Sequence, residues 1–290
     1  GEIVVENGRA VGVRMEADGR ILRAPVVISD AGVANTFGRL LPPAIAQKYG
    51  LARRLKTARP SGAHLCLYIG LAATAAELDL PKYNFWIYPD AEIDRCYAEG
   101  LKDPDAACLS AYISFPSAKD PDFTNRCPGR ATIDVITFVS YDAFSRWEES
   151  HWKKRPAEYE QLKERLTTTM LEMLYRHVPQ VRGKVDVHEL STPLTTRHFA
   201  NQPHGEIYGI DHTPSRFRQK WLRPQTPIGG LFLTGQDIAT CGVAGALFGG
   251  VLTASAVLRR NLLSAIAQSA EARAKAAHEP TRNPSPVEIG

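Results

Sequence analysis

The amino-acid sequence predicts an α+β fold, and three features of the sequence predict it. Short β-type runs bounded by Pro, Gly, Asn and Asp recur along the first half of the chain. A run with helical spacing follows over Tyr159–His177, and an uncharged, glycine-rich run occupies Ile238–Leu258. With 290 residues, of which 44% are hydrophobic, the chain can form one large domain or two ordinary ones.

The chain opens with a predicted β-hairpin. Glu2–Glu6 and Ala10–Glu16 are β-type runs joined through Asn7-Gly8, a dipeptide that favours a two-residue hairpin turn. A third strand is expected over Arg23–Ser29, and a helix over Pro42–Leu55. Further strands, expected in a mainly antiparallel sheet, are Ala63–Leu71, Asn84–Tyr88, Ala107–Phe115, Ala131–Val139 and Val185–Leu190.

The helix that ends at His177 is followed directly by Pro179, which cannot continue it. We expect His177 to face the negative end of the helix dipole rather than to bind a metal. Large apolar residues are lost from Ser269 onward, and three prolines follow. Ala270–Ala277 could extend the preceding helix, and the last dozen residues are expected to be disordered.

The uncharged run Ile238–Leu258 is long enough to cross a bilayer, so one interpretation is a membrane anchor. Three features favour a buried helix instead. A short apolar strand, Gly229–Thr234, leads into the turn Gly235-Gln236-Asp237. The helix proper is expected to begin near Gly242, which leaves a marginal length for a span, and its residues are mostly small.

A ligand site at the start of this helix has a physical basis. A helix start exposes unpaired N–H groups and about half a positive charge, and glycines there remove side chains that would block a ligand. Asp237 could accept hydrogen bonds from sugar or polyol hydroxyls, or it could serve only as a turn or cap residue. Strand, turn and helix together predict a site for a nucleotide-type cofactor with a polyol arm.

Charge and cysteine content limit the other classes of function. The net charge of +4 does not by itself imply nucleic acid, and no nucleic-acid partner is expected. Five scattered cysteines without a CxxC pair favour a reducing compartment and oppose a disulfide framework or a zinc site, so no metal is expected. We therefore expect a cytoplasmic protein, peripheral to a membrane if it is associated with one.

The segment Leu190–Gly250 resembles the C-terminal part of FAD-dependent oxidoreductases of the phytoene desaturase and retinol saturase type. The residues that carry the resemblance include Thr234-Gly235-Gln236-Asp237, Trp221-Leu222-Arg223-Pro224 and the glycine-rich helix start. Ser140–Leu166 is similar to the same group, closest to its retinol saturase-like branch. The resemblance implies an α/β FAD-binding fold, incomplete at its N-terminus, with an antiparallel-sheet substrate domain.

The resemblance also implies roles for particular residues. Asp237 would bind the ribityl chain of FAD, as part of the turn with Gly235 and Gln236. The amides around Gly242, Val243, Gly245 and Ala246 would face the N1/C2-carbonyl edge of the flavin, where the helix dipole stabilises negative charge. The substrate would be a hydrophobic polyene or isoprenoid-like molecule that undergoes desaturation, saturation or isomerisation.

The sequence departs from this family at one motif. Such enzymes carry an N-terminal Gly-x-Gly-x-x-Gly that holds the FAD pyrophosphate, and no such spacing occurs in the 290 residues. The expectation is a C-terminal fragment that lacks its N-terminal FAD-binding half, does not hold FAD tightly and is inactive alone. The alternatives are a non-catalytic or regulatory partner subunit with the same fold, and the membrane-anchored protein.

Two further groups of residues are candidates. Tyr208 and His198 lie near the cofactor segment and could donate a proton to a substrate. A segment that interleaves basic and aromatic residues could contact a membrane surface or could simply be solvated. Its residues are Arg216, Arg218, Lys220, Trp221 and Arg223.

We expect four regions along the chain. Residues 1–55 are the return to the FAD-binding domain, and residues 56–193 form the substrate-binding domain. Residues 194–268 contain the FAD-binding strand, turn and helix, and residues 269–290 form the polar tail.

Overall fold

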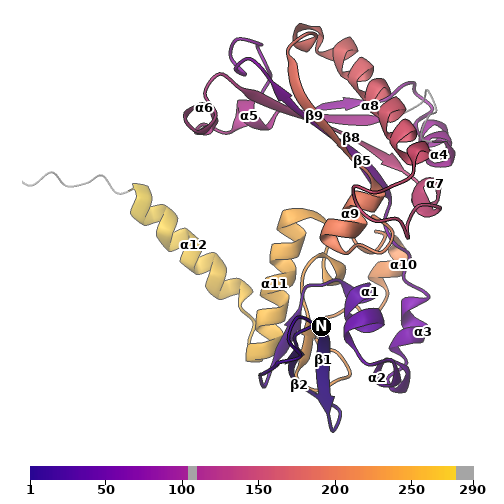
Figure 1. Ribbon diagram of the computed structural model, residues 1–290. Coiled ribbons are helices and arrows are strands. Elements are labelled where there is room, and N and C mark those ends of the chain that lie inside the picture. The colour runs from indigo at the N-terminus through magenta and orange to yellow at the C-terminus, as the bar shows by residue number, and fades with distance from the viewer. Residues whose placement is uncertain (104–109, 279–290) are drawn as a thin grey trace, which may run out of the picture. The chain divides into compact units, whose positions relative to one another are not determined.

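The computed structural model describes residues 1–103 and 110–278 (Figure 1). The chain divides into two units. Unit 1 consists of Gly1–Lys56 and Phe217–Gly290, and unit 2 consists of Thr57–Arg216. In the described part of the chain, the strands form three sheets, two in unit 1 and one in unit 2. This mixture of helices and mainly antiparallel sheets confirms the predicted α+β class.

The predicted hairpin is present at the start of unit 1. Strands β1 (Glu2–Glu6) and β2 (Arg9–Arg14) pair antiparallel, and β3 (Ile21–Arg23) pairs with β2. Asn7 and Gly8 both have positive φ angles, 49° and 77°. Positive φ at both central residues is the requirement of the hairpin turn that the Asn-Gly dipeptide predicts.

The predicted third strand, Arg23–Ser29, is wrong as a single strand. The structure separates it into β3 and β4 (Val27–Ser29), which belong to different sheets. Pro25 lies between them and has no N–H to donate to a ladder, which explains the break. Strand β4 pairs in parallel with β10 (Leu231–Leu233) from the far end of the chain.

The helices of unit 1 follow the two strands of this parallel pair. The predicted helix over Pro42–Leu55 is broken at Gly50, which has a φ of 67°. The helical elements of unit 1 are α1 (Val33–Asn35), η1 (Thr36–Leu40), α2 (Pro43–Lys48), α3 (Leu51–Leu55), η3 (Gln236–Ile238), α11 (Gly242–Leu258) and α12 (Leu263–His278).

The glycine-rich helix α11 begins at Gly242, as predicted. Among the helices that the structure describes, none combines the length and the apolar character that crossing a membrane requires. The alternative prediction of a membrane-spanning segment over residues 238–258 is therefore wrong. Helix α12 continues to His278, in agreement with the possible helical extension over Ala270–Ala277, because its alanine-rich sequence favours a helix. Residues 279–290 lie outside the described part of the chain.

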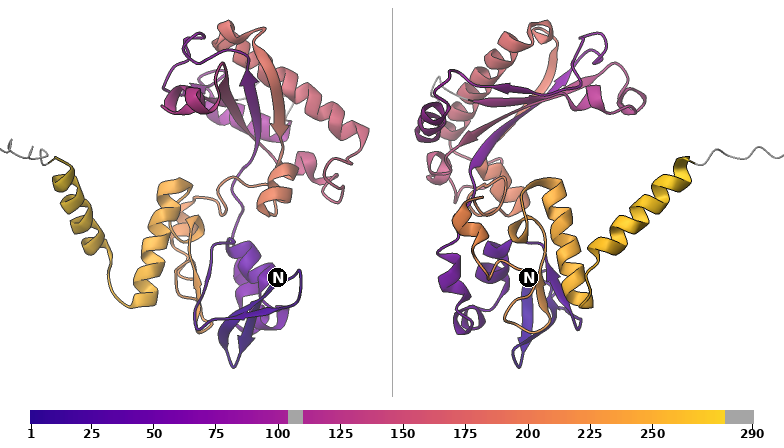
Figure 2. Two further views of the ribbon diagram at one scale, coloured as in Figure 1. Left: turned by 60° about the vertical axis from the view of Figure 1, so that its left-hand side comes forward. Right: turned by 180° about the vertical axis from the view of Figure 1, so that it is seen from behind.

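Unit 2 is built on one antiparallel sheet with the strand order β6-β7-β8-β5-β9 (Figure 2). Two of the predicted strands, over Ala63–Leu71 and Ala131–Val139, have the observed bounds, and part of Ala107–Phe115 lies outside the described residues. The strands are β5 (Ala63–Leu71), β6 (Phe85–Ile87), β7 (Ala111–Ser114), β8 (Ala131–Val139) and β9 (Val185–Ser191).

One face of this sheet packs against the long predicted helix, α8 (Figure 1). Leu65 and Leu67 of β5 and Ile133 and Val135 of β8 lie in one hydrophobic core with Leu166 of α8. The helical elements of unit 2 are α4 (Ile93–Lys102), α5 (Pro116–Lys119), α6 (Phe123–Arg126), α7 (Asp142–Ser145), α8 (Ala157–His177), η2 (Pro179–Val181), α9 (Pro193–Ala200) and α10 (Pro214–Phe217), whose last residue lies in unit 1.

The other face of the sheet carries the alternate residues of the same strands, and we call it the open face. Cys66 of β5 lies opposite Ile136 of β8, and Ile136 lies opposite Tyr112 of β7. Side chains along a strand alternate between the two faces, so these residues point away from α8. Cys96 is disulfide-bonded, whereas Cys66 and Cys127 are free thiols.

Two adjacent glycines of α11 test how closely this helix must pack. A Cβ atom on Gly249 would lie 2.4 Å from the carbonyl oxygen of Gly235, whereas a Cβ atom on Gly250 would meet nothing within 4 Å. We predict that Gly249→Ala lowers the free energy of unfolding by about 1–3 kcal/mol through overpacking. Gly250→Ala should raise it by about 0.5–1 kcal/mol, because alanine loses less backbone entropy in a helix.

Denaturant unfolding of the two variants and of the unchanged chain measures both effects. Equal free energies of unfolding for the two variants would show that α11 does not depend on this close approach.

Candidate functional site

The candidate cofactor site of unit 1 lies where the parallel strands β4 and β10 end. Leu233 of β10 pairs with Ser29 of β4, and the N–H of Thr234 donates to the Ser29 carbonyl at 3.0 Å. The turn after β4 and the turn Gly235-Gln236-Asp237 after β10 therefore start at the same edge. The carboxyl edge of parallel strands is where open α/β sheets bind their ligands.

Asp237 holds these two turns together. Its side chain is 5% exposed, and its Oδ2 accepts the N–H of Val33, the first residue of α1, at 2.8 Å. The residue before α1 is Gly32, which has no side chain to cap the helix, so Asp237 supplies a cap from the other end of the chain. This contact is the cap role that was the alternative interpretation of Asp237, and its role toward a ligand stays a prediction.

A second carboxylate, Asp30, lies beside Asp237. A Cβ atom on Gly235 would lie 1.8 Å from Asp30 Oδ1, so the Asp30 side chain lies over a position that only glycine can occupy. Partial burial raises the pKa of the Asp30 carboxyl above its ordinary value, and the neighbouring Asp237 carboxylate raises it further. Two adjacent carboxylates attract hydroxyl donors and repel phosphate, so this edge suits a polyol.

The start of α11 is accessible. Its N-cap residue, Cys241, forms no side-chain cap hydrogen bond, and a Cβ atom on Gly242 would meet nothing within 4 Å. Val243 is 88% exposed and Ala246 is half-buried. Gly242 and Val243, at the start of this 17-residue helix, are therefore open to a ligand in the positive field of the helix dipole.

Gly245 has a different role from the one that the sequence predicts. A Cβ atom at this position would lie 2.0 Å from the carbonyl oxygen of Thr240, on the chain's own backbone. Gly245 is buried, and it clears space for the turn before α11 rather than for a ligand. Thr240 is thus the neighbour that requires a glycine here, and the predicted role of the Gly245 amide toward a flavin stays a prediction.

The residues present fit an FAD in part. The accessible start of α11 matches the carbonyl edge of a flavin ring, which accepts hydrogen bonds and takes up negative charge. The carboxylates of Asp30 and Asp237 match the hydroxyl groups of a ribityl chain. Nothing in the 290 residues has the glycine spacing of a pyrophosphate-binding loop.

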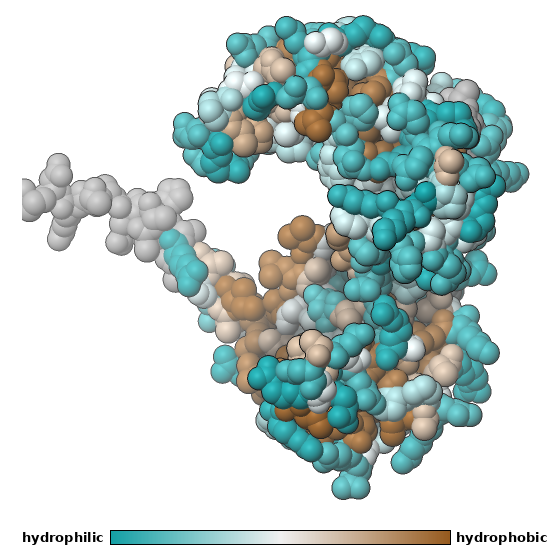
Figure 3. Space-filling model, viewed as in Figure 1, coloured by the Kyte–Doolittle hydropathy of each residue, from teal (hydrophilic) through white to brown (hydrophobic). Residues whose placement is uncertain are grey.

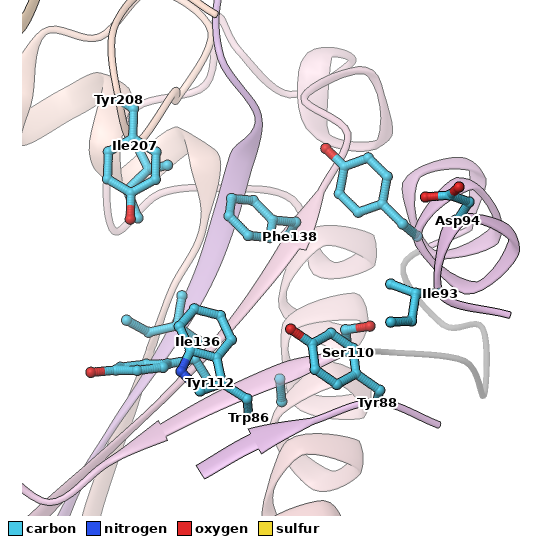
Figure 4. A pocket seen from close by; sticks show the side chains of 12 residues that line it. Trp86, Tyr88, Ile93, Asp94, Ser110, Tyr112, Ile136, Phe138, Ile207 and Tyr208 are labelled. Atoms are coloured by element: carbon cyan, nitrogen blue, oxygen red, sulfur yellow. The ribbon is translucent and has the colours of Figure 1, made fainter. Parts of the chain in front are cut away.

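Unit 2 contains an apolar cavity of about 460 Å³ on the open face of its sheet (Figure 4). Its floor includes Ile136 and Phe138 of β8, and α4 and the pair Ile207-Tyr208 supply its walls. The residues that line it are Trp86, Tyr88, Ile93, Asp94, Tyr97, Ser110, Ala111, Tyr112, Ile136, Phe138, Ile207 and Tyr208. Aromatic and aliphatic groups dominate, as in sites for hydrophobic small molecules.

A few polar groups interrupt this lining. The Oγ of Ser110 is buried without a hydrogen-bond partner in the described structure, and Tyr97 lies edge-to-face with Phe138 at 6.1 Å. Burial raises the pKa of the Tyr97 phenol, and the Asp211 carboxylate raises it further. Ser110 and the tyrosines could hydrogen-bond a polar group of a bound molecule.

The two candidate proton donors lie in different surroundings. Tyr208 lines the apolar cavity, and its backbone N–H donates to Ser61 Oγ at 2.9 Å. His198 lies in α9, where its exposed ring stacks on Trp152 at 5.4 Å, and it is not part of the cavity lining. The structure thus places Tyr208, but not His198, where it could contact a bound hydrophobic molecule.

The predicted basic and aromatic surface segment is only partly at the surface. Arg218, Lys220 and Arg223 are exposed, but Arg216 is 5% exposed, so its predicted surface role is wrong. Arg216 belongs to α10, which withdraws its side chain from solvent. Trp221 is half-buried because it packs on Phe37, with ring centroids 6.2 Å apart.

The sequence is similar to proteins of known activity over most of its length. No protein-family model matches the sequence. The chain is 38% identical to an all-trans-retinol 13,14-reductase of Danio rerio over 83% of this chain and 41% of that protein. It is 31% identical to an inactive all-trans-retinol 13,14-reductase of the same species, over 89% of this chain and 43% of that protein. The chain thus spans less than half the length of these relatives.

Lower identity links the chain to a second group and to a solved structure. A neurosporene-forming phytoene desaturase of Cereibacter sphaeroides is 27% identical over 81% of this chain and 43% of that protein. The crystal structure of an oxidoreductase from Methanosarcina mazei superposes with a TM-score of 0.51 and 18% identity, covering 89% of this chain and 48% of that chain. The chain is therefore a homologue of the all-trans-retinol 13,14-reductases and phytoene desaturases over less than half of their length, and it shares the fold of the Methanosarcina mazei protein.

Proposed function

We propose that this chain is part of an FAD-dependent oxidoreductase that acts on carbon–carbon bonds of a hydrophobic polyene or isoprenoid-like substrate. The observation that carries the proposal is the accessible start of α11, which follows the Asp237 turn where the resemblance puts the flavin. The relatives support it, because their names describe reduction of retinol and desaturation of phytoene.

Unit 1 would hold the flavin through two kinds of contact. The N–H groups of Gly242 and Val243 would donate to the carbonyl edge of the ring, and the positive end of α11 would stabilise negative charge there. The carboxylates of Asp30 and Asp237 would accept hydrogen bonds from the ribityl hydroxyls. When bound, FAD supplies the ring that exchanges a hydride with the substrate.

Unit 2 would hold the substrate in the cavity of its open face. Trp86, Tyr112 and Phe138 offer flat apolar surfaces to a conjugated chain and exclude water from it. The Tyr208 hydroxyl would be available as a proton donor beside such a chain. Reduction, desaturation and isomerisation of a polyene all require this kind of binding site.

The pyrophosphate of FAD would need a site that these 290 residues do not supply. We propose that an N-terminal FAD-binding half with a Gly-x-Gly-x-x-Gly motif, outside the present sequence, completes the cofactor site. A non-catalytic relative is the second candidate, favoured by the similarity to an inactive all-trans-retinol 13,14-reductase. Turnover of retinol or phytoene by the chain with its FAD-binding half would support the enzyme and exclude this second candidate.

We predict that the 290-residue chain binds FAD weakly, and that it binds riboflavin with nearly the same affinity. The contacts that it supplies reach the ring and the ribityl chain, which both molecules share. Flavin fluorescence titrations measure the two affinities. Stoichiometric FAD retained through purification, or much tighter binding of FAD than of riboflavin, would contradict the absence of a pyrophosphate site.

Substitutions of Asp237 should separate its structural contact from its proposed contact with the cofactor. Asp237→Ala leaves the buried Val33 N–H without an acceptor and should cost about 1–3 kcal/mol of stability. Asp237→Asn keeps an acceptor oxygen and should unfold much closer to the unchanged chain. Both should lower riboflavin affinity about tenfold, by loss of a charge-assisted hydrogen bond. Unchanged flavin affinity in Asp237→Asn would limit Asp237 to its cap role.

A charge placed on the floor of the apolar cavity should exclude its ligand. We predict that Ile136→Asp lowers the affinity for all-trans-retinol at least about tenfold, because the carboxylate would have to be desolvated. Val187→Asp is the matched control, since Val187 is 61% exposed on the same sheet and does not line the cavity. Retinol fluorescence titrations compare the variants, and equal losses in both would place the retinol elsewhere.

A further inference from the structure

A second cavity, of about 570 Å³, lies in unit 1 at the C-terminal end of α11. Arg223, Arg259 and Arg260 line it, together with the polar side chains of Ser255 and Asn261. The described residues that line it include no carboxylate. A guanidinium group binds phosphate through two parallel N–H donors, so three of them without a counter-charge favour a phosphate-bearing anion.

The turn that carries two of these arginines has a fixed backbone. The N–H of Arg259 donates to the carbonyl of Ala256 at 3.4 Å, and the N–H of Arg260 donates to that of Ser255 at 3.0 Å. These two bonds form a Schellman motif, the common C-terminal cap of a helix. Ser255 Oγ accepts the N–H of Leu262 at 3.2 Å, which ties the next residues to α11.

Arg259 occupies a position that favours glycine. It has φ 53° and ψ 38°, the left-handed conformation in which a side chain crowds the following carbonyl. Helices that end in a Schellman motif most often have glycine at this residue. Glycine would fit this backbone without strain, so the turn itself does not require an arginine at this position.

This cavity is distinct from the candidate flavin site. Helix α11 has 17 residues, so its two ends lie roughly 25 Å apart at about 1.5 Å per residue. The flavin site uses the positive N-terminal end of the helix. The arginines lie at the negative end, where they also offset the helix dipole and remain net positive around the cavity.

Exposed apolar side chains lie next to the arginines in sequence. Leu258 is 63% exposed, and Leu263 and Ile266 at the start of α12 are 43% and 47% exposed. Figure 3 shows apolar surface over α11 and the first part of α12. A free phosphate would gain nothing from these side chains, whereas a bilayer would bury them while its headgroups meet the arginines.

We propose that the cavity lined by Arg223, Arg259 and Arg260 binds the phosphate of an anionic phospholipid and holds unit 1 at a membrane surface. The site differs from the surface predicted from sequence, with which it shares only Arg223. It is independent of the redox function, because it uses none of the residues assigned to the flavin or to the apolar cavity.

Vesicle co-sedimentation of the 290-residue chain tests the proposal. The chain should bind phosphatidylcholine vesicles that contain phosphatidylglycerol and should not bind phosphatidylcholine alone. Arg259→Gly should lower the partition coefficient about fivefold, and Arg259→Gly with Arg260→Gln about thirtyfold, at about 1 kcal/mol for each arginine near an anionic surface. The melting temperature of Arg259→Gly should equal or exceed that of the unchanged chain, because glycine relieves the left-handed strain.

Two control variants carry the same change of charge as the double variant. Arg53→Gln with Arg54→Gln alters the exposed face of α3 in the same unit and should leave vesicle binding nearly unchanged. An equal loss of vesicle binding in this control would show that only the net charge of the chain matters, and would overturn the proposed site. If only Arg218→Gln with Lys220→Gln lowered vesicle binding, the membrane contact would be the basic and aromatic segment predicted from sequence, and the proposed site would be overturned.

Competition with inorganic phosphate at constant ionic strength distinguishes the two possible ligands, a phospholipid headgroup and free phosphate. Under the proposal it competes poorly with vesicles, because it gains none of the apolar contact. Displacement of the chain by phosphate as efficiently as by soluble short-chain phosphatidylglycerol would mean that the cavity takes free phosphate, and would overturn the membrane role.

Discussion

The parallel pairing of β4 with β10 is the constraint on which the rest of unit 1 depends. The two strands come from opposite ends of the sequence, and residues 57–216 between them form unit 2. Because parallel strands end at one edge, the pairing brings the turn after β4 against the turn after β10. The hydrogen bond from Val33 to Asp237 and the close approach of Asp30 to Gly235 both depend on this pairing.

The fold could be predicted from the sequence where the local pattern was complete. Strands β5 and β8 alternate between buried and less buried residues along nearly their whole length, and both have the predicted bounds. The strand predicted over Arg23–Ser29 was wrong because its β-branched residues favour a strand, whereas Pro25 interrupts the ladder. Helix α4, which was not predicted, has charged residues over much of its surface, and its few apolar positions give no long periodic run.

The candidate sites could be predicted only in part, because their residues act through neighbours that a sequence does not reveal. Asp237 was identified from its turn, but its bond to Val33 depends on the β4–β10 register. Gly245 and Gly249 accommodate backbone, and the sequence could not tell this from clearance for a ligand. The apolar cavity was missed because its residues come from β6, β7, β8, α4 and Ile207-Tyr208, which only the strand order β6-β7-β8 and the loop packing assemble.

The charges of unit 1 determine which chemical groups of a ligand each of its parts can bind. Asp30 and Asp237 make the carboxyl edge of β4 and β10 negative, so a phosphate placed there would be repelled, whereas a hydroxyl would be accepted. The start of α11 is positive and open, but a flavin carbonyl edge that approaches Gly242 leaves the diphosphate of FAD to be bound elsewhere. The phosphate therefore requires a second helix start, from the proposed FAD-binding half, and the arginines at the far end of α11 are too distant to replace it.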